Sequence, residues 1–320
     1  MFGLNNQCIV DFDEEYHGIE EYESAVPRWC PGCGDNAILS SVQRLCRDEQ
    51  LPPERTVFVS GIGCSSRFPH HMGTYGFHGL HGRALPVAEG VKIRRPDLHV
   101  FVNMGDGDCC SIGSAHWIHA IRYNMNLVAI VHDNEIYGMT KMQASPTTPQ
   151  GLRTNTTPFG AKLKPLNILA TTLGVTNASF VANVTDWMPE SMYKILQMAF
   201  HHRGFSFVRV VQRCPHYLPH LLDPIVTDPN NTIMLLHEDG LDISDDLGKI
   251  YKNHLAHDPS DLNKAREIAS MDDKVPVGIL YRDPSVPCYD DLQKPRRQVT
   301  MEMRREALDK ELNKFAVYEN

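Results

Sequence analysis

The sequence lacks any apolar run long enough to cross a bilayer, and its acidic first residues do not have the form of a signal peptide. It also lacks an excess of basic residues, because 31 Lys and Arg against 39 Asp and Glu give a formal net charge of −8. A deficit of basic residues argues against nucleic acid as a main partner, since phosphate backbones are bound by basic faces. Internal repeats and low-complexity tracts are absent too. We therefore expect a protein that binds neither membrane nor nucleic acid.

The sequence has few cysteines for a protein stabilised by a secreted disulfide framework, and their number, nine, is odd. This usage fits the reducing cytoplasm, where we expect the protein to reside. Two of the nine form a CxxC pair in "RWCPGCGDNAIL" (residues 28–39), directly before a helical pattern. From these residues alone, Cys30 and Cys33 are candidates to hold a zinc ion, an iron–sulfur cluster or, less favourably, a disulfide.

Short apolar runs rich in β-branched residues predict buried strands, and helical patterns lie between them. The predicted strands are residues 56–60, 99–104, 126–131 and 205–211, with a weaker one at 178–184. The predicted helices are about 34–47, 84–95, 111–124, 164–173 and 186–202. Unbroken apolar runs suit a parallel sheet covered on both faces. The alternation predicts an α/β fold with a doubly wound, mostly parallel sheet.

Glycines, carboxylates and cysteines follow these strands, where ligands bind in such sheets. The segments after four strands read "GIGCSS", "GDGD", "HDNEIYGMT" and "QRCP". Because the carboxyl ends of parallel strands meet at one edge, these four segments predict a single site.

The "GDGD" turn and the "HDNEIYG" segment together predict a magnesium and diphosphate site. Gly105 and Gly107 allow the backbone to approach a ligand closely. The Asp106 carboxylate, the Asn134 amide oxygen and the backbone carbonyl of Ile136 are the kind of oxygen ligands that Mg²⁺ prefers. The pattern resembles the thiamine diphosphate motif, which runs from GDG to an NN pair, except that Asp133 stands where many families have Asn.

A narrower resemblance covers residues 28 to 218. The segments "WCPGCG", "GIGCSSR", "LHGRALPVAEG", "GDGD", "IYGMTKMQASPTT" and "RCP" occur in the order found in the β subunit of 2-oxoacid:ferredoxin oxidoreductases. This resemblance implies the thiamine diphosphate-binding fold and one [4Fe–4S] cluster. The positions that match its four ligands are Cys30, Cys33, Cys64 and Cys214. Thiolate chemistry alone suits zinc as well, so the cluster is inferred from the resemblance together with the thiamine motif.

The resemblance also implies roles for residues around the cofactor. Positions that match cofactor-binding ones are Ile62, Gly63, Cys64, Ser65, His81, Gly82, Gly105, Gly107, Asp108, Gly138 and Met139. His81 is a candidate catalytic residue, with loop capping as its alternative, and Arg83 is a weaker one. Arg67 and Lys141 are candidates to bind the anion of the substrate or of CoA, because cationic side chains pair with carboxylates; solvated surface charge is the alternative.

The remaining five cysteines receive no ligand role. Cys109 and Cys110 are expected to be small buried fillers, as free cysteines often are. Cys46 is expected on a helix face, Cys8 in the N-terminal tail and Cys288 in a proline-rich stretch.

The family's reaction converts a 2-oxoacid, CoA and oxidised ferredoxin into an acyl-CoA, CO₂ and reduced ferredoxin, and it is reversible. Thiamine diphosphate supplies the electron sink for decarboxylation. The motifs look closest to the 2-oxoglutarate branch, although enzymes for pyruvate, branched-chain and aryl 2-oxoacids share much of the pattern. The resemblance also implies an α subunit that carries the pyrimidine-binding domain, usually in an (αβ)₂ assembly. No dinucleotide fingerprint for NAD is present.

The predicted organisation is a tail at 1–27, the cofactor domain at 28–220 and an irregular extension at 221–320 that packs on the core and the partner. The extension is expected to hold short helices, a strand and turns, followed by a charged helix near 300–316. The small basic clusters "RRPD" and "KPRRQ" are either solvated surface or contacts for an acidic ferredoxin. Two other functions stay open: a non-redox thiamine-dependent decarboxylase or carboligase, and a non-catalytic subunit stapled by zinc.

Overall fold

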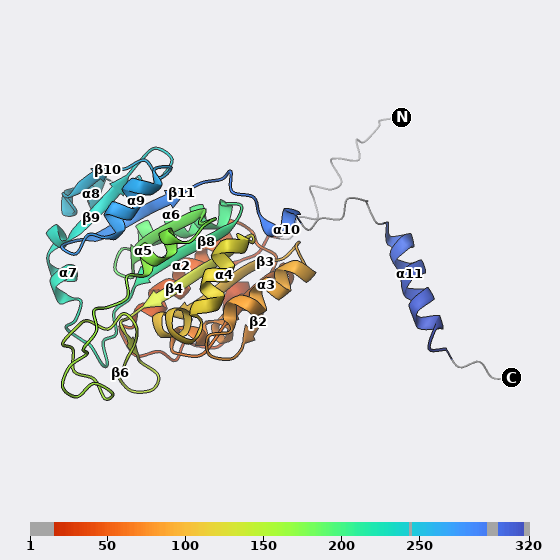
Figure 1. Cartoon of the computed structure of the whole chain (residues 1–320), viewed down its shortest axis with the longest axis horizontal. Helices are drawn as coiled ribbons and strands as arrows, with labels where there is room; N and C mark the ends of the chain where they lie inside the picture. The colour runs from red at the N-terminus through yellow and green to blue at the C-terminus, as the bar shows by residue number, and fades with distance from the viewer. Residues whose placement is uncertain (1–15, 243–244, 293–299, 317–320) are drawn as a thin grey trace.

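A long twisted sheet with helices on both faces forms the body of the protein (Figure 1). The computed structural model describes residues 16–242, 245–292 and 300–316. Within these residues the main sheet has nine strands in the order β10-β9-β11-β7-β8-β4-β3-β1-β2, and β5 pairs with β6 in a separate hairpin. The strands are β1 (Thr56–Ser60), β2 (Tyr75–His78), β3 (His99–Gly105), β4 (Leu127–Asp133), β5 (Ile136–Tyr137), β6 (Gln143–Ala144), β7 (Phe180–Thr185), β8 (Phe205–Val211), β9 (Thr232–Leu236), β10 (His254–Ala256) and β11 (Val275–Arg282).

Strand direction decides where the functional segments meet. The six strands from β2 to β7 in the sheet order are parallel to one another. Strand β11 pairs antiparallel with β7, and β9 and β10 run in the direction of β11. The carboxyl ends of β1, β3, β4 and β8 therefore share one edge of the sheet.

Helices cover both faces of the sheet and enclose two apolar layers. Side chains of α2 and α6 pack on one face, and those of α3, α4, α5 and α9 pack on the other. The helices are α2 (Gly34–Asp48), α3 (Ala84–Arg94), α4 (Ser114–Tyr123), α5 (Ile168–Gly174), α6 (Pro189–His201), α7 (Asp223–Thr227), α8 (Asp245–Ile250), α9 (Leu262–Ala269), α10 (Tyr289–Leu292) and α11 (Met301–Asn313). Short helical turns are η1 (Ile19–Tyr22), η2 (Pro53–Arg55), η3 (Ser65–His71), η4 (Asp108–Ile112) and η5 (Pro229–Asn231). The predicted doubly wound α/β fold is confirmed.

Most predicted elements are present with small shifts at their ends. Strands β1 and β8 have the predicted bounds, because their apolar runs are sharply delimited. Helix α5 begins at Ile168, later than the predicted residue 164. Pro165 lies in the intervening loop, and the Asn167 side chain caps the helix by accepting a hydrogen bond from the Ala170 amide.

The C-terminal region is more regular than the sequence suggested. One strand was expected beyond residue 220, but β9, β10 and β11 all join the main sheet. Strand β10 has only three residues, too few for a detectable pattern. The sheet thus continues across the predicted boundary at 220, and the division into 28–220 and 221–320 stays a prediction.

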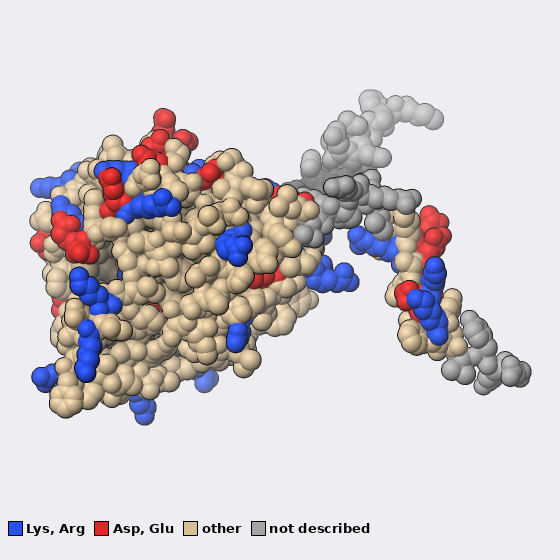
Figure 2. Space-filling view, viewed as in Figure 1, with Lys and Arg blue, Asp and Glu red and all other residues tan. Residues whose placement is uncertain are grey.

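Helix α11 confirms the charged helix expected near 300–316. Thr300 caps it by accepting a hydrogen bond from the Met303 amide, and none of its residues is buried. Figure 1 shows α11 apart from the sheet, and Figure 2 shows side chains of both charges along it. Cys8 and the "KPRRQ" cluster lie outside the described residues. Where the chain is described, none of its helices combines the length and apolarity that crossing a membrane requires.

Candidate active site

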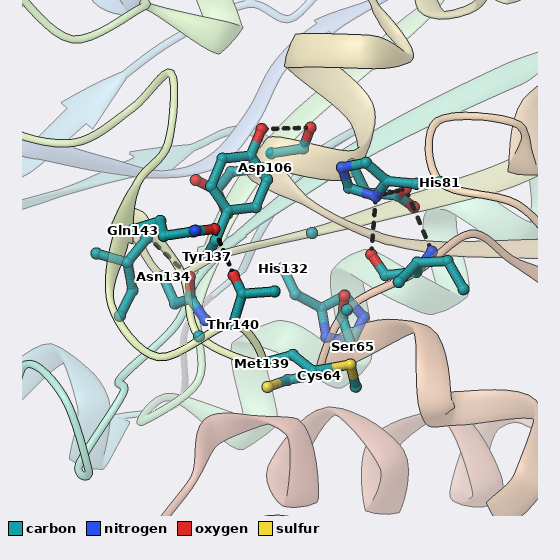
Figure 3. A pocket seen from close by; sticks show the side chains of 17 residues that line it. Cys64, Ser65, His81, Asp106, His132, Asn134, Tyr137, Met139, Thr140 and Gln143 are labelled. Atoms are coloured by element: carbon teal, nitrogen blue, oxygen red, sulfur yellow. Dashed lines mark hydrogen bonds and ion pairs between the residues drawn. The ribbon is translucent and has the colours of Figure 1, made fainter. Parts of the chain in front are cut away.

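A cavity of about 410 Å³ lies at the shared carboxyl edge of β1, β3 and β4 (Figure 3). Thirteen of the residues predicted from sequence line it: Ile62, Gly63, Cys64, Ser65, His81, Gly105, Asp106, Gly107, Asp108, Asn134, Ile136, Gly138 and Met139. In Figure 3 Asp106 lies at one end of the cavity, and the sulfur-bearing side chains of Cys64 and Met139 lie at the other. The cavity therefore has an acidic end and a sulfur-rich end.

The acidic end holds more carboxyl groups than cationic side chains to pair with them. Asp106 and Asp133 are buried, and the Thr147 hydroxyl lies 2.7 Å from the Asp106 Oδ2 and 2.8 Å from the Asp133 Oδ1. A hydroxyl has one proton and can donate to only one of these carboxylates. Burial and the nearby Asp133 charge raise the pKa of Asp106 to about 7. This end of the cavity is suited to a bound cation.

Arg209 explains why position 133 holds an aspartate and not the asparagine found in many families. Its Nη2 lies 2.6 Å from the Oδ2 of Asp133, whose side chain is fully buried. Glu135 follows in a left-handed conformation (φ 63°), and burial with the Asp133 charge raises its pKa to about 8. Arg209 thus interacts with two of the three carboxyl groups at this end, and an asparagine at 133 would leave it without its ion-pair partner.

These raised pKa values predict a pH dependence of stability for the cofactor-free protein. Asp106 and Glu135 hold protons in the folded state up to about pH 7 and about pH 8, whereas the ordinary pKa values of these groups are 3.8 and 4.5. Between those limits the unfolded chain binds fewer protons than the folded one, so the free energy of unfolding falls as pH rises. We expect a loss on the order of a few kcal/mol between pH 5.5 and 8, measured by urea unfolding. The loss should shrink in Asp106→Asn, and an equal loss in that variant would contradict the assignment.

Asp108 connects three segments at the rim of the cavity. Its Oδ1 accepts hydrogen bonds from the amides of Gly82 (2.6 Å) and Ile62 (3.3 Å) and lies 2.8 Å from the His81 Nδ1. Burial raises the pKa of this carboxyl, and the two amides and His81 oppose the rise. Gly82 itself does not line the cavity, but its positive φ of 74° directs its amide at Asp108. The "GDGD" turn and the "LHG" loop are therefore held together.

The turn after β3 has a backbone that neighbouring groups can approach closely. Residues Asp108–Ile112 form a π-helical turn, a feature often found at functional sites. A Cβ on Gly107 would lie 2.1 Å from the Tyr137 ring, so only glycine fits there. The Tyr137 hydroxyl donates a hydrogen bond to the Gly107 carbonyl at 3.3 Å, which ties the turn to β5.

The four cysteines predicted as ligands come together beside the sulfur-rich end. Cys64 interacts electrostatically with Cys30, Cys33 and Cys214. Hydrogen bonds join their segments: the Trp29 indole donates to the Cys64 carbonyl at 2.7 Å, and the Gly34 amide donates to the Arg213 carbonyl at 3.3 Å. Burial and Asp35 raise the pKa of the thiols of Cys33 and Cys64, so ligand binding there would release protons.

The other described cysteines differ from these four. Cys46, Cys109, Cys110 and Cys288 are buried, whereas Cys30 is exposed and Cys33, Cys64 and Cys214 are partly exposed. The expected burial of Cys109 and Cys110 is confirmed. Among the described residues, no three His, Cys, Asp or Glu side chains are grouped around a single ion position. A [4Fe–4S] cluster does not need such a group, because each cysteine binds a different iron atom.

Arg67 and Lys141 lie outside the cavity lining. Arg67 is half-buried and interacts electrostatically with Cys64 rather than facing the cavity. Lys141 has an exposed side chain in a turn with a φ of 70°. Their roles with substrate or CoA stay predictions, as do the roles of the other site residues.

Sequence reasoning missed four lining residues and several supporting ones. The missed lining residues are His132, Tyr137, Thr140 and Gln143. A histidine near the end of the apolar strand β4 was a visible signal, because a fully buried imidazole needs polar partners. Thr147 is within the quoted "SPTT" segment, but its contact with Asp106 depends on a loop that no periodic pattern describes.

Two protein families match separate parts of the chain. Residues 61–210 match the thiamine pyrophosphate enzyme C-terminal TPP-binding domain, and residues 246–297 match the C-terminal part of the pyruvate ferredoxin oxidoreductase β chain. Over 281 residues the chain is 34% identical to the 2-oxoacid:ferredoxin oxidoreductase 1 subunit beta of Aeropyrum pernix, covering 86% of this chain and 84% of that relative. The chain belongs to the 2-oxoacid:ferredoxin oxidoreductase β-subunit family.

Two further similar proteins carry 2-oxoglutarate in their names. The chain is 46% identical over 210 residues to the 2-oxoglutarate oxidoreductase subunit KorB of Mycobacterium tuberculosis, a match over 66% of this chain and 56% of that protein. A solved 2-oxoglutarate:ferredoxin oxidoreductase from Magnetococcus marinus, with 2-oxoglutarate, coenzyme A and succinyl-CoA bound, has a TM-score of 0.76 and 33% identity. That likeness covers 96% of this chain and 98% of the solved chain.

Proposed function

We propose that the chain carries thiamine diphosphate, Mg²⁺ and a [4Fe–4S] cluster in a CoA-dependent 2-oxoacid:ferredoxin oxidoreductase. The observation that carries the proposal is the juxtaposition, at one sheet edge, of an under-compensated acidic cavity end and four converging cysteines. A decarboxylase or carboligase without redox chemistry has no use for the cysteines, and a zinc-stapled subunit has no use for the cavity.

The residues present fit thiamine diphosphate and its metal. Asp106, Asn134 and the Ile136 carbonyl would hold Mg²⁺, whose charge would offset that of the ionised Asp106 beside Thr147 and Asp133. The amides and glycines of the 105–108 turn would contact the diphosphate. When bound, the cofactor supplies the electron sink that decarboxylation needs. Asp108 holds the His81 ring at the cavity rim, within 5.9 Å of the Tyr137 ring.

The residues present also fit an iron–sulfur cluster. Cys30, Cys33, Cys64 and Cys214 come from three segments tied together by hydrogen bonds, so the segments that would supply the ligands are held together without the cluster. Cys64 additionally lines the cavity, which puts one ligand in contact with both groups. Electrons from the substrate would thus have a short path to the cluster.

The activity requires partners beyond this chain. We propose an α subunit that supplies the pyrimidine-binding domain, an (αβ)₂ assembly, and ferredoxin as the electron acceptor. The names of the relatives, subunits of multi-chain oxidoreductases, support these partners. We also propose the cytoplasm as the location, because nine cysteines, an odd number, fit a reducing compartment better than a secreted disulfide framework.

2-Oxoglutarate is the proposed substrate, with succinyl-CoA as the product. The Mycobacterium relative is named for 2-oxoglutarate, and the Magnetococcus structure holds 2-oxoglutarate and succinyl-CoA. Pyruvate, branched-chain and aryl 2-oxoacids are the alternatives, which the general name of the Aeropyrum relative leaves open. A substrate panel on the co-purified complex, with CoA and a viologen dye, decides between them. Preference for another 2-oxoacid would overturn this assignment without affecting the cofactor sites.

Asp106→Ala should abolish stable binding of thiamine diphosphate while leaving iron content near that of the wild type. The change would remove the charged oxygen ligand of Mg²⁺, whereas Cys64, the proposed cluster ligand that lines the cavity, lies at its other end. Cofactor occupancy and iron are measured on the same purified sample. Asp97→Ala is a matched control, because that aspartate lies on the surface and pairs with Arg95. Equal thiamine occupancy in Asp106→Ala and wild type would refute the metal assignment.

A further inference from the structure

Two buried polar side chains contact the sulfur of Cys33 from different elements. Gln212, just after β8, is 1% exposed, and its Nε2 donates a hydrogen bond to the Cys33 Sγ at 3.3 Å. Asp35, in the first turn of α2, is fully buried, and its Oδ2 lies 3.4 Å from the same sulfur. The sequence motifs did not single out either residue.

Burying the Gln212 amide costs free energy that packing alone does not recover. Its Oε1 is buried without a hydrogen-bond partner among the described residues. An apolar side chain of the same size would avoid that cost. Because burial also keeps the Gln212 amide from bulk water, the Nε2 contact with Cys33 is the interaction that the glutamine provides.

Asp35 is held in place from the cavity side. Its Oδ1 accepts a hydrogen bond from the His132 Nδ1 at 2.7 Å, and both side chains are fully buried. The other ring nitrogen of His132 faces the Asn103 amide at 3.1 Å. Since His132 also lines the cavity, the carboxylate beside Cys33 is positioned by a side chain of the cofactor pocket.

We propose that Asp35 and Gln212 set the reduction potential of the cluster in opposite directions, and that His132 is the positioning residue for Asp35. This inference rests on the proposed function, because it requires a cluster bound through Cys33. Hydrogen bonds to the sulfurs and nearby charge are known determinants of such potentials.

The signs follow from the charge that reduction adds. An electron makes the cluster more negative, so the Gln212 N–H donor stabilises the reduced form and raises the potential. The Asp35 carboxylate repels the added electron and lowers the potential, and its effect is strong because no water screens it at this depth. The two effects therefore oppose each other at one ligand sulfur.

The test is a redox titration of the co-purified complex, followed by the electron paramagnetic resonance signal of the reduced cluster. Asp35→Asn keeps the shape and removes the charge, so the potential should rise. Gln212→Met keeps the size and removes the donor, so the potential should fall. A tenfold change in the equilibrium constant for one-electron reduction, which is about 59 mV, is the expected size of each shift. If Gln212→Met loses iron, Gln212→Asn, whose shorter amide does not reach the sulfur, provides the same test.

Asn36→Ala is the matched control. The Asn36 side chain donates to the carbonyl oxygen of Cys33 at 3.2 Å and not to its sulfur, so its loss should leave the potential unchanged. Unshifted potentials in Asp35→Asn and Gln212→Met at wild-type iron content would overturn the inference alone. Absence of iron from the wild-type complex would instead overturn the proposed function.

Discussion

Replacing Cys64 with alanine should bleach the protein, remove its iron and abolish viologen reduction. In the proposed function each cysteine of the set formed by Cys30, Cys33, Cys64 and Cys214 would bind one iron, so a missing thiolate would open the cluster to solvent. Cys64 should give the largest loss, because it interacts with the other three and also lines the cavity. The measurements are iron content, visible absorption and dye reduction by the co-purified complex.

Cys109→Ser and Cys110→Ser are the matched controls for this prediction. Both cysteines are buried in the turn after β3, close in sequence to the cavity but outside the set of four. They should keep wild-type colour. Loss of iron in Cys109→Ser together with retention in Cys64→Ala would show that the ligands are assigned to the wrong cysteines.

The chain without its α subunit should be inactive even when loaded with iron and thiamine diphosphate. Thiamine enzymes need a carboxylate beside the aminopyrimidine ring of the cofactor. Within the described residues, the carboxylates that line the cavity are Asp106 and Asp108. The first is assigned to the metal, and the second is engaged with Gly82, Ile62 and His81.

The two glutamates near the strand ends do not provide that carboxylate either. Glu89 lies within α3 and does not line the cavity, and Glu135 stands beside the metal ligands with its pKa raised by burial. We expect no CoA-dependent viologen reduction by the isolated chain with any 2-oxoacid, and recovery when an α subunit is added. Robust turnover by the isolated chain would indicate a self-contained thiamine enzyme.

Local sequence patterns were sufficient to predict the strands whose carboxyl ends carry the candidate site. The run "TVFVS" predicted β1 with its observed bounds, since all five residues are buried between two helical layers. Strand β2 escaped detection because its four residues are all exposed at the edge of the sheet. Strand β9 was not predicted although it is as long as β1, and its place in the sheet depends on pairing with β10 and β11.

The residues of the site likewise fall into two groups: those predictable from local sequence and those whose roles depend on contacts between distant segments. Glycines, carboxylates and cysteines directly after strands were predictable, because strand direction alone brings them together. The supporting residues were not, since their roles depend on contacts between distant segments. Arg209 pairs with Asp133 from the neighbouring strand, and Asp35 reaches His132 across 97 positions of sequence.

The proposed electron transfer from substrate through the thiamine cofactor to the cluster can be tested by electron paramagnetic resonance of the anaerobic αβ complex, before and after addition of 2-oxoglutarate. We expect the signal of a reduced [4Fe–4S] cluster to appear in the wild type when the substrate is added. No such signal should appear in Asp106→Ala, which keeps the cluster but lacks the thiamine cofactor, and Cys64→Ala should contain no iron. A full substrate-dependent signal in Asp106→Ala, or a wild-type complex without iron, would contradict the proposed function.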